Sequence, residues 1–177
     1  MYESYGTEVI RIRPATAADA PALAAALSRN RAHMRPWEPY RSEAYYTAEG
    51  QAARLGDGGR RWFAVDGDEI VASATLSGIA LGPFRSASLG YWVDARCTGQ
   101  GLATRLVEEV CRAAREELGL HRIEAGTVLA NHASQRVLAK SGFERIGTAP
   151  RYLHIDGEWR DHHLFQRILH DESPPQG

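Results

Sequence analysis

The most informative stretch of the chain is Arg96-Cys97-Thr98-Gly99-Gln100-Gly101-Leu102-Ala103-Thr104, which joins a predicted strand to a long predicted helix. Glycines in such a turn let backbone N–H groups face outward, and the N-terminus of a helix adds a partial positive charge. Together these features favour a cradle for phosphate groups. A Gly-x-Gly turn alone is equally typical of a plain strand–helix connection, so the rest of the chain has to decide.

Two kinds of nucleotide-binding loop do not fit this stretch. A P-loop needs four residues between its glycines, followed by Lys and then Ser or Thr, and these are absent. A dinucleotide fingerprint needs Gly or Ala where Thr104 stands, and it usually opens the first strand–helix unit of a parallel sheet. Glu124 lies at the distance expected for the acidic residue of that fingerprint, but it falls in the middle of a predicted strand after several hairpins.

The periodicity of apolar residues places this stretch within a mixed sheet. A helical pattern begins at Leu102 and ends before Gly119, a natural C′ residue. Asp66-Gly67-Asp68 and Asp156-Gly157 predict hairpin turns. The other predicted elements are helices over 16–31, 47–55 and 133–141, strands over 9–13, 61–65, 69–76, 88–93, 122–128, 144–148, 151–155 and 162–169, and an irregular segment over 35–40. This order combines hairpins with crossovers and predicts an α/β (α+β) protein with helices on the faces of a mixed sheet.

Length and composition limit the possible classes of protein. A chain of 177 residues favours one domain, expected over 8–170 between an N-terminal tail (1–7) and a flexible, proline-containing C-terminal tail (171–177). The 21 basic and 22 acidic residues offer no broad basic face for nucleic acid and no polybasic membrane anchor. Two cysteines, no secretory signal and no long apolar run predict a cytoplasmic protein with unpaired thiols.

Three spaced motifs resemble a known superfamily. Arg96-x-x-Gly99-x-Gly101, Asn131-x-x-Ser134 and Lys140-x-Gly142-Phe143 are similar to the motifs of the GNAT superfamily of acyl-CoA-dependent N-acetyltransferases. The stretches 30–39, 89–92 and 156–162 resemble the branch that acetylates N-terminal residues of ribosomal proteins, especially alanine. The resemblance covers nearly the whole chain. It implies the GNAT fold, a mixed and mostly antiparallel sheet splayed between its fourth and fifth strands, with helices on both faces.

The same resemblance implies where acetyl-CoA would bind, in the gap between strands 89–93 and 122–128. Backbone groups of Trp92 and Val93 would hold the pantetheine arm and polarise the thioester carbonyl. Asn131 would hydrogen-bond the pantetheine, and Lys140 would reach toward the phosphates unless it is a solvated helix lysine. The residues expected to wrap the pyrophosphate are Arg96, Gly99, Gln100, Gly101, Leu102, Ala103 and Thr104. No metal is expected.

Direct transfer of acetyl to an amine calls for an acid and a base. Many members of the superfamily carry a Tyr that protonates the leaving thiolate, but Leu138 occupies that position, so Ser134 is the candidate acid. The alternative for Ser134 is a first-turn hydroxyl bonded to its own backbone. Glu38, in Pro-Trp-Glu-Pro, is the candidate base, and the alternatives are an anchor for the acceptor amine or a helix cap. Some relatives instead carry a Glu near the end of the third strand, where Ile79-Ala80 stands.

The acceptor is the least determined part of the prediction. Trp37, Glu38, Tyr40 and Tyr152 are the candidate acceptor-binding residues, although each aromatic ring is also consistent with packing. The preferred acceptor is the N-terminal residue of a ribosomal protein. The alternatives are a small amine such as an antibiotic or polyamine, and a CoA-binding module without catalysis. Whether the chain is a monomer or a homodimer stays open.

Overall fold

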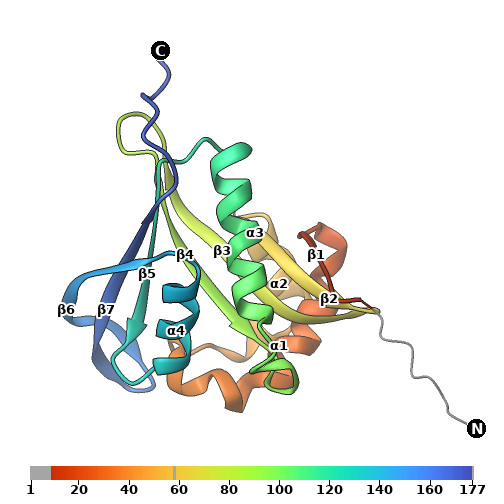
Figure 1. The fold of residues 1–177 in the computed structure, drawn as a ribbon. Coiled ribbons are helices and arrows are strands. Elements are labelled where there is room, and N and C mark those ends of the chain that lie inside the picture. The colour runs from red at the N-terminus through yellow and green to blue at the C-terminus, as the bar shows by residue number, and fades with distance from the viewer. Residues whose placement is uncertain (1–8, 58, 177) are drawn as a thin grey trace, which may run out of the picture.

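The computed structural model describes residues 9–57 and 59–176, which form a single sheet with helices packed on it (Figure 1). The predicted tail 1–7, Glu8 and the final Gly177 lie outside the described residues. Residues 171–176 follow the last strand without helix or strand structure. The described part of the chain holds no helix long and apolar enough to cross a lipid bilayer.

The sheet has seven strands in the order β1-β2-β3-β4-β5-β7-β6. The strands are β1 (Arg11–Pro14), β2 (Arg60–Asp66), β3 (Glu69–Ala80), β4 (Ser86–Val93), β5 (Arg122–Val128), β6 (Glu144–Ile155) and β7 (Glu158–Ile168). The helices are α1 (Ala20–Met34), α2 (Ala48–Leu55), α3 (Leu102–Glu116) and α4 (His132–Lys140), with short 3-10 turns η1 (Ala17–Asp19), η2 (Arg35–Trp37), η3 (Glu43–Tyr46) and η4 (Ala95–Cys97). All neighbouring strands are antiparallel except β4 and β5, which confirms the mixed, mostly antiparallel sheet.

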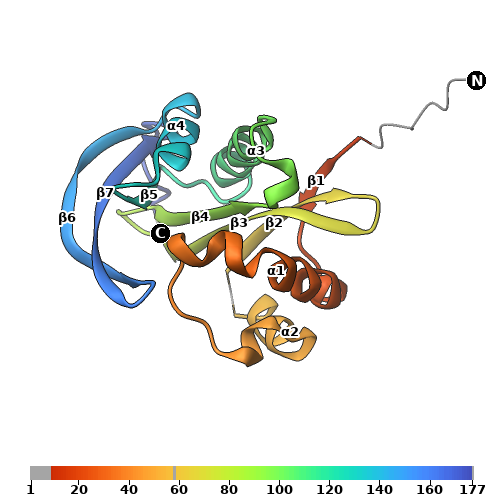
Figure 2. The same ribbon diagram turned by 90° about the horizontal axis from the view of Figure 1, so that it is seen from below.

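The helices lie on both faces of the sheet, as predicted (Figure 2). α3 and α4 cover one face, and α1 and α2 cover the other. Alternate residues of β2 serve the two faces: Trp62 and Ala64 belong to the core under α3, whereas Phe63 and Val65 belong to the core under α1. The sheet therefore separates two apolar layers, and its central strands are buried on both sides.

Local sequence signals explain several of these elements. The hairpin between β2 and β3 turns at Gly67, which has a φ of +54°, as the Asp-Gly-Asp signal predicts. α3 buries Leu106, Val107 and Val110 at helical spacing against the sheet. The helix ends at Glu116, two residues earlier than predicted, and Gly119 follows with a φ of +60°.

The largest differences from the predicted strand bounds are in β6, β3 and β7, and the other strands shift by one or two residues. The segments 144–148 and 151–155 form one strand, β6, whose pairing with β7 is irregular between Ala149 and Leu153. Arg151 lies at this irregularity with a φ of +48°, and its N–H donates to the Asp161 carboxylate at 2.8 Å. The irregularity is a bulge within one continuous strand. In the sequence, a bulge and a break between two strands give the same pattern of residues, so two strands were predicted. β3 runs on to Ala80, and β7 begins at Glu158.

β4 and β5 separate at the point where the site is expected. Their parallel pairing is limited to Ser86–Ser88 against Arg122–Glu124. Beyond these residues β4 remains paired to β3, and β5 remains paired to β7. The second halves of β4 and β5 therefore diverge, and the predicted splay is confirmed.

Candidate active site

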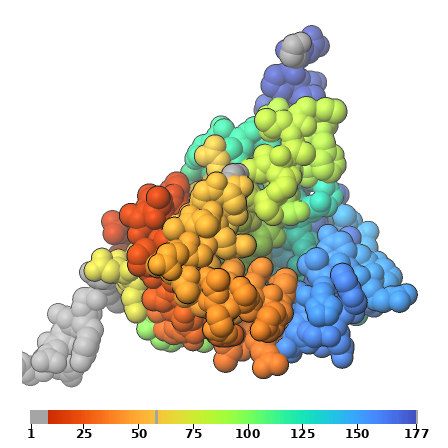
Figure 3. All heavy atoms as spheres, turned by 180° about the vertical axis from the view of Figure 1, so that it is seen from behind, coloured from red at the N-terminus to blue at the C-terminus, as the bar shows by residue number. Residues whose placement is uncertain are grey.

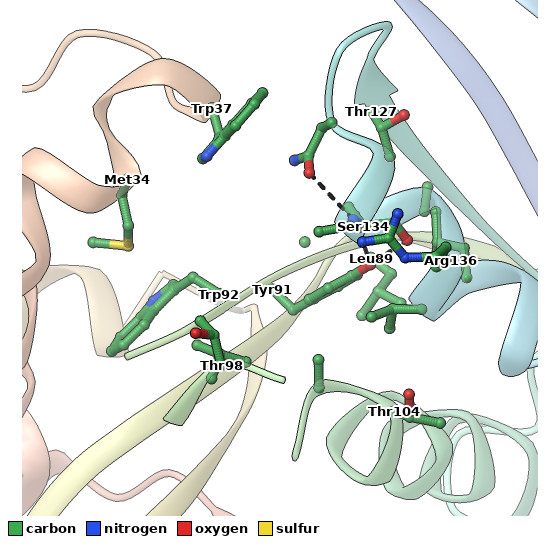
Figure 4. Close-up of a pocket in the computed structure, with 18 of the residues that line it drawn as sticks. Met34, Trp37, Leu89, Tyr91, Trp92, Thr98, Thr104, Thr127, Ser134 and Arg136 are labelled. Carbon is green, nitrogen blue, oxygen red and sulfur yellow. Dashed lines mark hydrogen bonds between the residues drawn. The ribbon is translucent and has the colours of Figure 1, made fainter. Parts of the chain in front are cut away.

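A cavity of about 530 Å³ occupies the gap between β4 and β5 (Figure 4). Its walls are the second halves of these two strands, the first turns of α3 and α4, and the end of α1 with η2. The predicted site residues that line it are Trp37, Glu38, Trp92, Val93, Gly99, Gly101, Ala103, Thr104, Asn131, Ser134 and Lys140. Residues predicted from separate parts of the sequence are thus brought together around one space.

The glycine turn before α3 presents its backbone to the cavity. Gly99 and Gly101 have φ values of +73° and +76°, and a Cβ at either position would meet no atom within 4 Å. The amides of Leu102, Ala103 and Thr104 are in the first turn of α3 and have no acceptor within the helix. Open space beside backbone donors at a helix N-terminus is the arrangement that binds phosphate groups.

The turn is held by Asp94, which is almost fully buried at the end of β4. Its carboxylate accepts hydrogen bonds from the Arg96 N–H at 2.9 Å, from Asn30 at 3.1 Å and from Arg29 at 2.8 Å. Burial alone would raise the pKa of Asp94, but the hydrogen bonds from Arg96, Asn30 and Arg29 hold that pKa well below its usual range. Asp94 therefore ties α1 to the start of the glycine turn as a charged group.

The side chains of three predicted members of the cradle do not line the cavity. The Arg96 guanidinium pairs with Asp94 at 3.1 Å and with Glu69 at 3.0 Å. The Gln100 side chain donates to the Arg96 carbonyl at 3.3 Å, and the Leu102 side chain is buried in the core. The side chains of these residues stabilise the turn through contacts with the protein and are not directed at a ligand. Burial raises the pKa of the neighbouring Cys97 thiol, so a reactive thiolate is not favoured there.

Ser134 is positioned by groups from two elements. Its N–H donates to the Asn131 side chain at 3.2 Å, so Asn131 caps α4 (Figure 4). Its hydroxyl lies 2.6 Å from the Tyr91 hydroxyl, which is also 3.2 Å from the Ser134 carbonyl oxygen. The Ser134 hydroxyl therefore bonds to a tyrosine on β4 instead of its own backbone.

Tyr91 is a site residue that the sequence reasoning missed. Burial raises the pKa of Tyr91 to about 12, although the hydrogen bond with Ser134 opposes that shift. The phenol consequently stays protonated at neutral pH and has a proton to donate. The phenol has one proton and two acceptors on Ser134, the carbonyl oxygen and the hydroxyl oxygen. In the arrangement in which it donates to the hydroxyl oxygen, the serine proton is free to point into the cavity. The sequence motif Leu89-Gly-Tyr-Trp92 could have pointed to Tyr91, but the motif alone does not indicate what the tyrosine does.

The end of the cavity where the acceptor residues were predicted is lined by the end of α1, η2 and β7. Trp37 and Glu38 line the cavity there, and the Arg35 guanidinium pairs with Asp156 in the hairpin turn at 2.9 Å. Figure 3 shows these two regions, orange and blue, in contact from behind. Burial raises the pKa of Glu38, against the opposing charges of Arg41 and Arg54. A carboxylate with a raised pKa is a stronger base, as the predicted role requires.

The remaining predicted aromatic residues are placed outside this cavity. Tyr40 is 83% exposed and does not line it. Tyr152 lies on the hairpin, with its ring centroid 5.3 Å from that of His162. The structure thus brings Trp37 and Glu38 to the cavity and leaves Tyr40 and Tyr152 outside its lining.

His162 is a second residue that lines the cavity without having been assigned to it. His162 is 3% exposed, and its Nδ1 lies 3.0 Å from the Arg160 carbonyl oxygen, so that nitrogen carries a proton. His163 faces the other way and bonds to Thr148 at 2.9 Å. The two histidines, adjacent on β7, thus point to opposite faces of the strand. Residues 9–57 and 59–176 contain no group of three His, Cys, Asp or Glu side chains able to hold a metal ion.

Comparison with known proteins decides the family. Residues 10–144 match the acetyltransferase (GNAT) domain family. The chain belongs to the GNAT acetyltransferase family. This acetyltransferase is 35% identical over 166 residues to the ribosomal protein uS5-alanine N-acetyltransferase of Escherichia coli (strain K12), covering 88% of this chain and 86% of that protein.

Solved structures agree with this assignment. The ribosomal-protein-S5-alanine acetyltransferase of Vibrio fischeri superimposes with a TM-score of 0.88 and is 34% identical, covering 92% of this chain and 94% of that chain. RimJ of Mycobacterium smegmatis, in complex with CoA-disulfide, gives a TM-score of 0.82 at 30% identity, covering 89% and 80%. The protein is therefore an acetyl-CoA-dependent N-acetyltransferase. The open space at Gly99 and Gly101 and the amides of α3 fit the diphosphate of that co-substrate.

Proposed function

We propose that this acetyltransferase modifies the N-terminal residue of a protein, most closely a ribosomal protein, by direct attack of the amine on acetyl-CoA. The supporting observation is a likeness that spans the chain: 34% identity over 92% of its length to a ribosomal-protein-S5-alanine acetyltransferase, with a TM-score of 0.88. Glu38 and Trp37 line the same cavity as Ser134 and the glycine turn, so an acceptor amine beside Glu38 would lie in the cavity that holds acetyl-CoA.

The proposed chemistry assigns each step to a residue of this chain. The Trp92 and Val93 backbone groups hold the thioester and donate to its carbonyl oxygen as negative charge develops there. Glu38 takes the proton of the incoming ammonium, directly or through one water molecule. Ser134 donates its proton toward the departing sulfur, and Tyr91 supplies the hydrogen bond that leaves this proton free. Holding both substrates in one cleft provides the attack geometry.

Replacing Glu38 by glutamine is expected to give a pH-dependent loss of activity. The base works only when ionised, so wild-type turnover should fall as pH drops through the raised pKa of Glu38. Between that pKa and about 8, where an α-amino group itself loses its proton, the variant should be slowest relative to wild type. Above this range the amine binds neutral, and the two rates should converge. A pH–rate profile at saturating acetyl-CoA measures this.

The control for Glu38→Gln is Glu43→Gln, which removes an exposed carboxylate bound by Arg31 at 2.6 Å and outside the cavity. Its profile should match wild type. If Glu38→Gln lowers turnover by the same factor at every pH, Glu38 is not the base. A raised acceptor KM with unchanged turnover would instead assign Glu38 to anchoring the ammonium.

The acceptor itself is tested with a ribosomal-protein extract. The extract is incubated with enzyme and isotopically labelled acetyl-CoA, and new acetyl groups are located by mass spectrometry. We expect labelled N-terminal residues on a small number of ribosomal proteins and none with the Gly101→Asp variant as the inactive control. Label confined to small amines would favour the small-molecule alternative. Absence of free CoA release with any amine would identify a binding module without catalysis.

A further inference from the structure

A second cavity of about 490 Å³ lies on the face of the sheet covered by α1 and α2. It shares four lining residues with the acetyl-CoA cavity: Glu38, Gly90, Tyr91 and Trp92. β4 therefore forms a common wall, and Glu38 stands where the two spaces meet. A group bound in the second cavity would belong to the acceptor, since the first cavity contains the phosphate cradle.

The floor of the second cavity is polar because of the register of β3. Ser73, Thr75 and Ser77 alternate along the strand and line this cavity. Their neighbours Ala72, Ala74 and Leu76 face the other way and are buried in the core under α3. Three hydroxyl-bearing side chains on one face are unusual for a central strand, which is otherwise filled with apolar residues on both faces. The floor thus offers hydrogen bonds instead of apolar contact.

The walls of the cavity are rich in arginine. Arg41, Arg54 and Arg61 line it, against the acidic Asp57 and Glu38. Arg61 extends from β2 with a side chain only 10% exposed, and its Nη2 pairs with Asp57 at 3.2 Å. The Asp57 carboxylate also accepts the Gly59 N–H at 3.0 Å. The formal charge of these five side chains is +1 when both acids are ionised, so the lining of the cavity has a net positive charge.

Two of these guanidinium groups have unsatisfied donors. The Nε atoms of Arg41 and Arg61 are buried, and in residues 9–57 and 59–176 neither has a hydrogen-bond partner. Arg41 and Arg54 rest on the ring of Tyr45, at 4.7 Å and 5.2 Å from its centroid, which fixes them in place without using their N–H groups. Leaving a buried donor without a partner is unfavourable, and an anionic ligand would supply the missing acceptors.

We propose that the second cavity binds a carboxylate of the acceptor, so that the enzyme prefers N-terminal segments with an acidic side chain close to the reactive amine. This inference rests on the proposed function. The guanidinium fork matches a carboxylate in two parallel hydrogen bonds, and burial makes such bonds stronger than they are in water. Arg61 and Arg41 supply the donors, and the hydroxyl groups of β3 complete the lining. Glu38 at the shared wall receives the amine end of the same molecule.

The first test compares matched peptides and uses no variant. Each pair of peptides begins with alanine, and its two members differ only by Glu or Gln at one position. Four pairs place this position at the second, third, fourth or fifth residue. Binding to the enzyme–CoA complex is measured by calorimetry, and kcat/KM by release of CoA. We expect the Glu peptide to be favoured about tenfold or more at one position, the effect of one charge-assisted hydrogen bond. Equal binding at every position overturns the proposal.

Arginine variants then locate the effect. Arg61→Gln and, independently, Arg41→Gln should abolish the preference for Glu, mainly through the acceptor Kd and KM. The matched control is Arg60→Gln, which changes an exposed residue beside Arg61 on β2 that lines neither cavity. CoA affinity and melting temperature show that each variant is folded. A preference that survives in both cavity variants overturns the assignment to this cavity.

A free amino acid distinguishes this proposal from the function on which it rests. L-alanine and alaninamide differ by one carboxylate and have no peptide segment. If L-alanine is acetylated well and alaninamide poorly, with the difference lost in Arg61→Gln, while no peptide reacts, the carboxylate site stands and the proposed protein acceptor fails. If both peptides of a pair react equally and L-alanine shows no advantage over alaninamide, the protein acceptor stands and the carboxylate site is overturned.

Discussion

Replacing Gly101 by aspartate is expected to lower acetyl-CoA affinity by about 100-fold or more while leaving the protein folded. The new carboxylate would occupy the open space beside the first turn of α3, where the diphosphate is expected. Two like charges about 4 Å apart repel by roughly 4 kcal/mol near a protein surface, and a loss of about 2.7 kcal/mol already reduces affinity 100-fold. Calorimetric titration with acetyl-CoA measures the change.

The fold should tolerate this substitution. Gly101 has a φ of +76°, and aspartate and asparagine accept that conformation better than other side chains do. A carboxylate beside a helix N-terminus is also favourable for the helix. Melting temperature and circular dichroism should therefore stay close to wild type. The matched control is Gly101→Asn, which has the same shape without the charge and should bind acetyl-CoA much more tightly than Gly101→Asp. Equal weakening by both would assign the effect to the space that the side chain fills and not to its charge, and wild-type affinity in Gly101→Asp would contradict the cradle.

The parts of the fold that the sequence predicts are those governed by local physics. A two-residue turn at Gly67 and a helical stripe along α3 depend on neighbours a few positions away, and both are where they were expected. The bulge at Arg151 depends on an aspartate ten residues away, on the opposite strand, so β6 was predicted as two strands. The splay of β4 from β5 was reached through family resemblance, because strand pairing is not visible in local spacing.

The site divides in the same way. The proposed cradle is contiguous in sequence, so Gly99 and Gly101 stand out as a candidate turn, and the resemblance of two further motifs to the family supports their assignment. The contact between Tyr91 and Ser134 joins residues 43 positions apart, and no sequence pattern predicts it. Arg41 and Arg61 each look like ordinary surface arginines in the sequence. Their shared cavity exists only because α2 and the segment before it fold over β2 and β3, which sequence spacing does not reveal.

Ser134→Ala is expected to reduce turnover on the order of 100-fold with little change in acetyl-CoA affinity. A group that assists the leaving thiolate acts mainly in the transition state, so its loss lowers kcat and leaves ground-state binding intact. Steady-state kinetics and calorimetry with CoA measure the two quantities separately. Ser28→Ala, on an exposed part of α1, is the control and should behave as wild type. An unimpaired Ser134→Ala would exclude the acid role.

Tyr91→Phe tests whether the tyrosine positions that serine. The variant keeps the ring and removes the hydroxyl that lies 2.6 Å from Ser134, so kcat should fall by about tenfold, less than for Ser134→Ala, with KM nearly unchanged. If Tyr91 acts only through Ser134, the double variant should be no slower than Ser134→Ala alone, because the two residues form one unit. If the factors by which the two single variants lower kcat multiply in the double variant, Tyr91 acts on the thioester independently of Ser134. Since the pKa of Tyr91 is about 12, its phenol holds its proton throughout the working range, and the kcat ratio between Tyr91→Phe and wild type should stay constant from pH 6 to about 10.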